Sequence, residues 1–329
     1  MTTVLPFPLQ TELPTEALEH PEDILAFVLQ HLRQNQRCAL VVVTGTLGGS
    51  VRRPGAMMAV NEAGEIAGYV SGGCIDNDVA LHAQQVLQTG ESKTLRYGEG
   101  SPFMDIQLPC GGGIDVTICP NPDLMIVETA SQLLEDRKTV ALTVDQIGRL
   151  GLHQDPDVRS GYQKDVFYAV CQPRLKLRLA GRGADIIATA RLASGAGFTT
   201  LVQSPDDHIL DAVRGYPGIT AQKISAVDYT AEQKDDAFTA FLLMFHDTDL
   251  EIPLLQDALG GEAFFIGAVG SRNAQKRRKT GLQEINVPNA AIARIHGPVG
   301  LIPAMRDASM LAISALSHVI ATYHEKYWS

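Results

Sequence analysis

The chain has 329 residues, 45% of them hydrophobic and 19% charged, with a formal net charge of -10 and a pI near 5.4. This length is sufficient for two domains with hydrophobic cores, and the composition excludes collagen-like, repeat and disordered chains. The acidic balance argues against a nucleic-acid partner, because phosphate contacts need clustered Lys and Arg. The one dense basic run, 276–279, is expected to form a solvated helix face.

The amino-terminal residues and the cysteines bear on localisation. The first residues lack a basic region followed by an apolar one, and no stretch is long enough to span a bilayer, so we expect neither a signal peptide nor a membrane partner. Five scattered cysteines without a CxxC pair are typical of a reduced, cytoplasmic protein rather than of a disulfide scaffold or zinc finger. The cysteines are Cys38, Cys74, Cys110, Cys119 and Cys171.

The first part of the chain, residues 1–147, has the pattern of an α/β domain. Apolar residues near helical spacing predict a helix at its start, and two apolar runs flank a turn at 61–64, as in a hairpin. Helices are expected at 16–36, 74–87 and 123–134, and strands at 39–46, 56–60, 66–70, 94–97, 114–119 and 140–144.

The remainder of the chain predicts a linker and a second domain. Residues 148–174 include the stretch with the weakest pattern for regular structure, since glycines and a proline lie among polar residues, and we place the inter-domain segment there. Residues 175–329 alternate strands with helices, which predicts a Rossmann-like domain with a parallel sheet. The expected strands are 175–180, 199–203, 238–245 and 263–266, the expected helices are 185–194 and 308–323, and a tight turn falls at 181–183.

Two glycine-rich loops each hold a cysteine: 71–76 contains Gly72, Gly73 and Cys74, and 109–113 contains Cys110 followed by glycines. Glycine allows positive φ and lets a ligand approach the main-chain amides. The first loop precedes a predicted helix, whose free N–H groups suit an anion and lower the pKa of a nearby thiol. A soft thiolate suits molybdenum–sulfur chemistry better than hard cations.

The alternative for every cysteine is a small packed hydrophobic side chain. We expect this for Cys38, Cys119 and Cys171, which lie in apolar strand contexts. For Cys74 and Cys110 the glycine setting leaves both interpretations open.

The loop 48–55 carries Arg52 and Arg53. Arginine forks bind phosphate and carboxylate well, so both side chains are candidate anion contacts. Two solvated surface arginines are an equally good interpretation of this loop alone.

Three blocks of the first part resemble the amino-terminal domain of the xanthine dehydrogenase accessory factor family (XdhC/CoxI type). They are 49–58 (GSVRRPGAMM), 70–75 (VSGGCI) and 110–112 (CGG). Three blocks of the second part are similar to the family's second-domain signature. They are 266–272 (IGAVGSR), 276–278 (KRR) and 293–301 (ARIHGPVGL). The blocks fall in the family's order and cover most of the chain.

This resemblance implies a protein that binds the molybdenum cofactor (molybdopterin), assists its sulfuration and inserts it into a molybdenum hydroxylase of the xanthine dehydrogenase type. It implies a maturation chaperone rather than a catalyst, a homodimer, and a cysteine desulfurase as a further partner. Carried over to this chain, Cys74 and Cys110 become contacts to the molybdenum or sulfur atoms. The backbone contacts would come from Gly72, Gly73, Gly111 and Gly112, and the anion contacts from Arg52 and Arg53.

The second domain departs from the family pattern at its glycine turn. The segment 181–186 has Ile186 where GxGxxG needs its third glycine, and the strand 199–203 is followed by Ser204 without an acidic residue to hold a ribose. NAD(P) binding is therefore doubtful. The region 303–309 keeps Arg306 but lacks the glycine and acidic positions of the family.

Three polar positions of the second domain have both functional and structural interpretations. His246-Asp247 could form a general base pair or be a strand-end His satisfied by its neighbour. His296 could act in a site or interact with helix-end carbonyls. The segment 270–272 could bind an anion, or Ser271 could be a helix N-cap.

Two other functions compete with the cofactor chaperone. The Rossmann pattern suggests an NAD(P)-dependent oxidoreductase, which predicts measurable nucleotide binding. A docking module without a ligand of its own would instead join a sulfur donor to the target enzyme.

Overall fold

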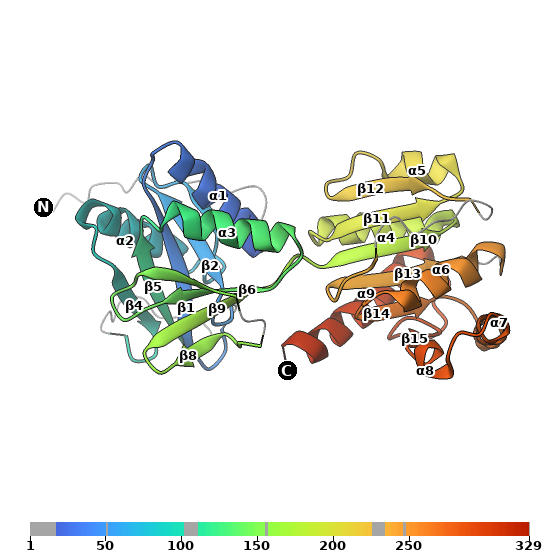
Figure 1. The fold of residues 1–329 in the computed structure, drawn as a ribbon. Helices are drawn as coiled ribbons and strands as arrows, with labels where there is room; N and C mark the ends of the chain where they lie inside the picture. Colours follow the sequence, from blue (N-terminus) through green and yellow to red (C-terminus); the bar gives the residue numbers. More distant parts are fainter. Residues whose placement is uncertain are drawn as a thin grey trace, which may run out of the picture. The chain divides into compact units, whose positions relative to one another are not determined.

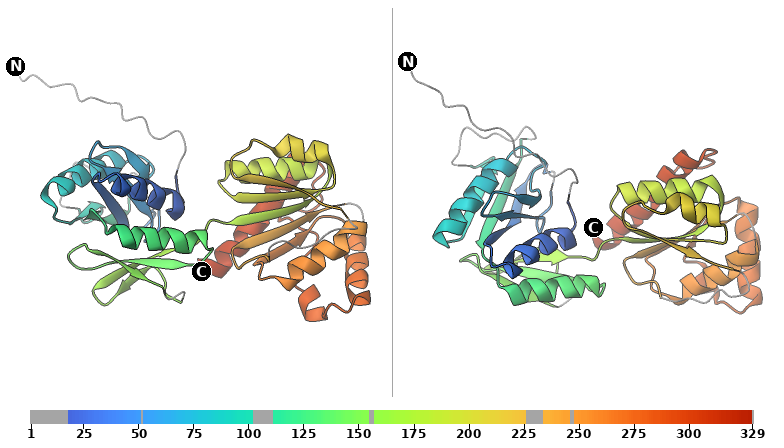
Figure 2. Two further views of the ribbon diagram at one scale, coloured as in Figure 1. Left: turned by 45° about the horizontal axis from the view of Figure 1, so that its top comes forward. Right: turned by 90° about the horizontal axis from the view of Figure 1, so that it is seen from above.

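The computed structural model describes residues 18–50, 52–101, 111–154, 157–225, 234–245 and 248–328. It forms two compact units, Met1–Pro173 and Arg174–Ser329, which are drawn in Figure 1 and, from two further directions, in Figure 2. Each unit is described by itself.

The first unit is built on a five-stranded antiparallel sheet, ordered β3-β2-β1-β5-β4. The central strand β1 pairs with β2 from Cys38 to Val42 and with β5 from Ala39 to Leu47. The strands are β1 (Cys38–Leu47), β2 (Met57–Asn61), β3 (Ile66–Gly68), β4 (Lys93–Gly98) and β5 (Gly113–Pro120). Each lies within three residues of its predicted range.

Helices cover both faces of this sheet (Figure 1). Successive side chains of a strand point to opposite faces, so Leu40 of β1 packs with α1 (Pro21–Arg33) and α3 (Leu124–Glu135), while Val41 packs with α2 (Asp76–Thr89). Because both faces are buried, β1 is apolar at nearly every position rather than at alternate ones.

A second antiparallel sheet, ordered β7-β6-β9-β8, completes the first unit. Its strands are β6 (Val140–Val144), β7 (Leu150–His153), β8 (Gly161–Gln163) and β9 (Val166–Cys171). The prediction of little regular structure around 148–163 was wrong. The glycines that suggested a linker lie in or beside short hairpins: Gly148 and Gly161 have positive φ values of 71° and 145°, which glycine adopts without strain.

The second unit has six parallel strands in the order β12-β11-β10-β13-β14-β15. The chain runs outward from β10 on one side, returns, and runs outward on the other, which is the Rossmann order. The predicted Rossmann-like fold with a parallel sheet is confirmed. The strands are β10 (Lys176–Gly181), β11 (Thr199–Ser204), β12 (Ile219–Lys223), β13 (Thr239–Met244), β14 (Phe265–Ala268) and β15 (Ile295–His296).

Two groups of helices bury the two faces of this sheet (Figure 2). One apolar cluster joins the sheet to α4, α5 and α9, and the other joins it to α6, α7 and α8. The helices are α4 (Gly183–Gly195), α5 (Asp207–Val213), α6 (Thr248–Gly260), α7 (Arg272–Glu284), α8 (Asn289–Ile292) and α9 (Ala308–Tyr327).

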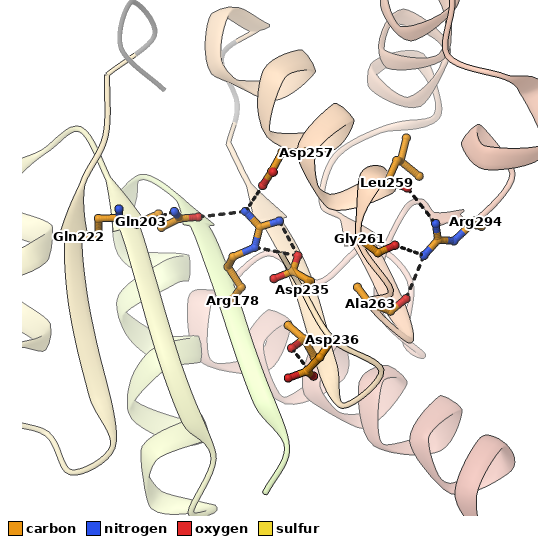
Figure 3. Close-up of polar contacts among 11 residues, drawn as sticks. Arg178, Gln203, Gln222, Asp235, Asp236, Asp257, Leu259, Gly261, Ala263 and Arg294 are labelled. Atoms are coloured by element: carbon orange, nitrogen blue, oxygen red, sulfur yellow. Dashed lines mark hydrogen bonds and ion pairs between the residues drawn. The ribbon is translucent and has the colours of Figure 1, made fainter. Parts of the chain in front are cut away.

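A buried arginine in the middle of β10 is hydrogen-bonded to side chains of β11, of α6 and of the segment before β13 (Figure 3). The Arg178 guanidinium donates to Asp235 at 2.6 and 3.0 Å and to Asp257 at 2.8 Å, and its Nη1 also donates to Gln203 Oε1 at 3.4 Å. Its carbon Cζ lies 4.2 Å from the centroid of the Phe241 ring. Buried charges persist where they are paired and hydrogen-bonded in this way.

A second buried pair corrects the expectation for the basic run 276–279. Arg278 is buried and donates to both Glu251 carboxylate oxygens, at 2.6 and 3.0 Å, and to the Val269 carbonyl. Lys276, Arg277 and Lys279 are exposed, as expected of a solvated face. The sequence does not distinguish the one inward-facing residue, because its partner lies on another helix.

Candidate functional site

The glycine-rich loops of the first unit leave the same end of the first sheet. Strand β1 ends at Leu47 opposite Gly113, where β5 begins, and β4 ends at Gly98, also opposite Gly113. On the other side of β1, the end of β3 at Gly68 lies opposite Met58, near the start of β2. We call this end, with the described residues of the loops 48–56, 69–75, 99–101 and 111–112, the loop end.

Two of these loops are in close backbone contact. A Cβ atom added to Gly112 would lie 2.5 Å from the Gly49 carbonyl oxygen and 2.6 Å from that of Leu47. The Glu99 amide also donates to the Gly112 carbonyl oxygen at 3.1 Å. Gly112 is therefore required by the approach of the protein's own backbone, which is a sufficient reason for glycine at this position without a ligand.

Cys74 lies on open backbone at the loop end. Its side chain is exposed, and Gly72 and Gly73 before it have φ values of 77° and 115°, as glycine was expected to allow. A Cβ atom added to Gly73 would meet nothing within 4 Å. Helix α2 begins only at Asp76, with Ile75 as its N-cap, so Cys74 immediately precedes the helix cap. The thiol is therefore accessible, with free space beside the adjoining backbone.

Asp76 organises this loop, although it was not among the predicted site residues. Its side chain is only 2% exposed. It accepts hydrogen bonds from the amides of Val70 at 2.8 Å and Ser71 at 3.0 Å, from the Ser71 hydroxyl at 3.1 Å, and from the Gly73 amide. The Gly73 amide, one of those expected to face an anionic ligand, is thus bound by the protein's own carboxylate. An acidic residue in the first helical turn after a glycine pair was the available signal.

The two candidate arginines differ. Arg52 is engaged: its Nη2 donates to the Glu19 carbonyl at 3.3 Å, its Nη1 lies 3.7 Å from Glu19 Oε2, and its Cζ lies 4.5 Å from the centroid of the Tyr69 ring. The Tyr69 hydroxyl donates to Glu19 at 2.6 Å, and burial and this hydrogen bond raise the pKa of Tyr69. Arg52 therefore holds its loop beside the loop 69–75. The Arg53 side chain is more exposed to solvent than that of Arg52.

The remaining cysteines separate into two groups. Cys38, Cys119 and Cys171 are buried in the core of the first unit, and burial raises the pKa of each thiol to about 12, so the expectation of packed side chains is confirmed. Cys110 lies outside the described residues. The adjoining Gly111 has a φ of 68°, and a Cβ atom added there would meet nothing within 4 Å. The predicted pairing of Cys74 with Cys110 thus stays a prediction.

The polar positions of the second unit are largely engaged in structure. Ser271 is the N-cap of α7 and accepts from the Ala274 amide at 3.2 Å. His296 stacks on Phe265 at 4.5 Å and meets His318 edge-on at 5.2 Å. Burial lowers the pKa of both histidines. The pair His246-Asp247 lies outside the described residues.

The glycine turn after β10 is tightly packed. A Cβ atom added to Gly181 would lie 2.4 Å from the Met244 carbonyl oxygen, and Ile186, at the place of the third glycine, is completely buried in the core. An acidic residue does follow β11: the Asp206 carboxylate lies 3.9 Å from Arg182 Nε, next to the turn. The strand order is that of a Rossmann fold. The Ile186 side chain, however, lies between helix α4 and the sheet, where a third glycine would let the two pack more closely.

The described parts of the chain contain no group of three or more His, Cys, Asp or Glu that could hold a metal ion. A polar hollow of about 360 Å³ lies between β4, β5 and the hairpins of the second sheet, and its lining includes Thr94, Asp145 and Lys164. It shares no residue with the loop end.

Comparison with known proteins identifies the family. Residues 31–98 match the XdhC and CoxI family, and residues 177–319 match the XdhC Rossmann domain. The chain is 33% identical over 296 residues to the molybdenum cofactor insertion chaperone PaoD of Escherichia coli (strain K12), covering 90% of this chain and 86% of that protein. The chain belongs to the XdhC and CoxI family. The resemblance inferred from its glycine and cysteine motifs is therefore confirmed.

A solved structure shares the fold of this XdhC and CoxI family chain. It is described as a xanthine dehydrogenase from Bacillus halodurans, is 21% identical, and superposes with a TM-score of 0.74 over 93% of this chain and 97% of that one. At this identity the match establishes the fold. Among the described helices, none is both long enough and apolar enough to cross a bilayer.

Proposed function

We propose that this XdhC and CoxI family protein is a molybdenum cofactor chaperone, which holds the cofactor at the loop end and delivers it to a molybdenum hydroxylase. The observation that carries the proposal is the position of Cys74: an exposed thiol beside positive-φ glycines with free space, where several loops leave one sheet. The kinship with an insertion chaperone supports the same role.

The donor set of the loop end fits a soft, partly anionic ligand. A thiolate is a good ligand for molybdenum and sulfur centres, and the open backbone at Gly73 and Gly111 allows close approach. When bound, the cofactor supplies the molybdenum centre that the client enzyme uses. In this proposal Cys74 and Cys110 contact its molybdenum or sulfur atoms, Gly72, Gly111 and Gly112 line it, and Arg53 contacts its anionic group.

The structure refines the roles of two proposed residues. Arg52 is assigned to holding its loop against Tyr69 and Glu19, because its guanidinium is already engaged there. Gly73 contributes space rather than its amide, because Asp76 accepts from that amide. Both residues therefore shape the binding surface instead of binding the anion directly.

The proposal has further parts that concern the protein's partners. We propose that the protein works in the cytoplasm as a homodimer, that it supports sulfuration of the bound cofactor, and that a cysteine desulfurase is the sulfur donor. NAD(P) is left out of the proposed ligands, since Ile186 fills the space of the third glycine.

Anaerobic reconstitution tests the cofactor site. Molybdenum and pterin should co-purify with the protein, and Cys74→Ala should lower their retention. Met125→Ala is the matched control: Met125 is also an exposed, sulfur-containing residue, but it follows the carboxyl end of β5, away from the loop end. Full retention in the double variant Cys74→Ala, Cys110→Ala would remove the assignment of the site.

Two outcomes would replace the proposal with another function. Calorimetric binding of NAD(H) or NADP(H), without retention of pterin, would favour the oxidoreductase. Capture of the client enzyme by protein stripped of cofactor, with no pterin binding on reconstitution, would favour a docking module.

A further inference from the structure

Helix α9 carries a row of exposed apolar side chains along one face. Met310 is 52% exposed, Ile313 47% and Ile320 44%, and Trp328, the residue that caps the helix, is 48% exposed. Residues three and four apart are neighbours on a helix surface, so these side chains form one stripe together with Ser317 and His324. We call the six residues Met310, Ile313, Ser317, Ile320, His324 and Trp328 the α9 stripe.

The stripe is not needed to hold α9 on its own unit. The opposite face of the helix supplies Ala315, Leu316, Val319 and Tyr323 to the core cluster beneath it. The stripe is continued by Leu301 and Ile302, each 55% exposed, because the Ile302 amide donates to Ser314 Oγ at 2.8 Å and fixes this loop against the helix. A contiguous apolar surface of this kind is typical of an interaction site.

The spacing of the stripe is self-complementary. Starting from Ser317, the stripe has Ile313 four residues before it and Ile320 three residues after it, and Met310 and His324 seven residues to either side. Two copies packed antiparallel with Ser317 at the two-fold axis would therefore set isoleucine against isoleucine. A small residue at the crossing point allows the helices to approach closely, and such an isologous contact needs one surface only.

The two ends of the stripe are complementary as well. In this arrangement the carboxyl end of one helix, with His324 and Trp328, faces the amino end of the other, with Arg306 and Asp307. An indole ring attracts a guanidinium, and an imidazole N–H donates a hydrogen bond to a carboxylate. The antiparallel helix dipoles also favour each other. A parallel pairing would place like ends together and lose all three contacts.

We propose that a second copy of this chain binds the α9 stripe, so that two α9 helices pack antiparallel about Ser317. The stripe is then the contact surface of the proposed homodimer. This inference rests on that homodimer and does not depend on cofactor binding. A helix of 20 residues is about 30 Å long. Because stable interfaces bury about 800 Å² per partner, Leu301 and Ile302 are needed to extend the contact beyond the helix.

Sedimentation of the full chain over a range of concentrations tests the surface. The unchanged chain should form a dimer, and Ile313→Glu or Ile320→Glu should shift it to monomer, at least tenfold weaker in Kd. Ile285→Glu is the matched control, because Ile285 is a similarly exposed isoleucine of the same unit, 41% exposed, outside the stripe. It should leave the dimer intact. Circular dichroism confirms that each variant is folded.

Cross-linking tests the antiparallel register. Ser317→Cys should form a disulfide between two copies under mild oxidation, since a residue on the two-fold axis faces its own copy. Ile285→Cys should give no more disulfide-linked dimer than the unchanged chain does. If both glutamate variants still form dimers, the α9 stripe is not the interface, although the homodimer itself would stand. A monomeric unchanged chain would overturn both, and neither result would alter the pterin retention that tests the cofactor site.

Discussion

Glycines have opposite surroundings at the loop end of the first unit and in the glycine turn of the second unit. At the loop end, Gly73 and Gly111 have positive φ and free space around them, and an exposed thiol lies beside the first. After β10, Gly181 has no room for a side chain because the Met244 carbonyl lies against it, and Ile186 fills the gap under α4. Free space beside the glycine, rather than glycine itself, distinguishes a candidate site from a packing contact.

The two regions also differ in how they satisfy buried polar groups. In the second unit, charges pair with charges: Arg178 with Asp235 and Asp257, and Arg278 with Glu251. At the loop end, one carboxylate, Asp76, binds several backbone amides of its own loop. The first arrangement stabilises a core, and the second fixes the shape of an exposed loop.

The largest expected effect comes from removing the buried cation of the second unit. Arg178→Met leaves two carboxylates without their partner and should destabilise this unit by about 3–5 kcal/mol. Hydrogen exchange measured separately over β10 to β14 and over β1 to β5 should show the loss in the second unit.

Restoring neutrality provides the control for this variant. Arg178→Met combined with Asp235→Leu should recover part of the stability, because fewer charges are left buried without a partner. Equal loss of protection in both units would contradict the view that the contacts of Arg178 stabilise the second unit alone.

A smaller loss is expected at the loop end. Asp76→Ala leaves the buried donors of Val70, Ser71 and Gly73 without their acceptor and should cost about 3 kcal/mol. It should also speed amide exchange of the 70–75 loop in the native protein. Thermal unfolding and site-resolved exchange measure the two effects.

Asp123→Ala is the comparison, because Asp123 caps α3 through a single bond to the Met125 amide at 2.8 Å. Loss of such a cap costs about 1 kcal/mol. If Asp76→Ala destabilises no more than Asp123→Ala, the loop is not organised by its carboxylate.

Alkaline pH should weaken the first unit through its buried thiols. Burial raises the pKa of Cys38, Cys119 and Cys171 from 9.0 to about 12. Above pH 9 the unfolded thiols ionise while the folded ones stay protonated, so the unfolded state binds fewer protons and stability falls as pH rises. At pH 10 the expected loss is about 1.4 kcal/mol per thiol, measurable by denaturant titration at pH 8 and 10.

Cys171→Ala separates this contribution from general alkaline effects. The variant is less stable at pH 8, but the further loss on going to pH 10 should be smaller than in the unchanged chain. An identical pH dependence in both would show that this buried thiol does not contribute.

The smallest expected effect concerns the exposed thiol. Cys74→Ala should change the free energy of unfolding by less than about 0.5 kcal/mol, as is usual for an exposed side chain. In the unchanged chain, mass spectrometry after brief alkylation should find Cys74 labelled and the three buried cysteines unlabelled. A native Cys74 that resists alkylation as they do would show that the thiol is not accessible.

Much of the secondary structure could be predicted because its signals are local. The apolar run of β1, the hairpin of β2 and β3, and the alternating pattern of 175–204 depend on neighbouring residues, and each was placed within a few residues. The strands β7, β8, β9, β12 and β15 were not predicted. Four of them, β7, β8, β12 and β15, are short strands at the edges of their sheets. The apolar run of β9 falls within the segment 148–174, where the surrounding glycines and polar residues had indicated a linker.

The family, the Rossmann-like fold of the second unit and the loops that could carry chemistry follow from residue order alone, because motif order and hydrophobic period are properties of the linear chain. Which residues of those loops are available depends on folding. Asp76 binds the Gly73 amide, Arg52 is engaged by Glu19 and Tyr69, and Arg278 is buried while its neighbours are solvated. These outcomes depend on partners brought together by folding, so hydrogen bonding and burial settle them where residue type alone does not.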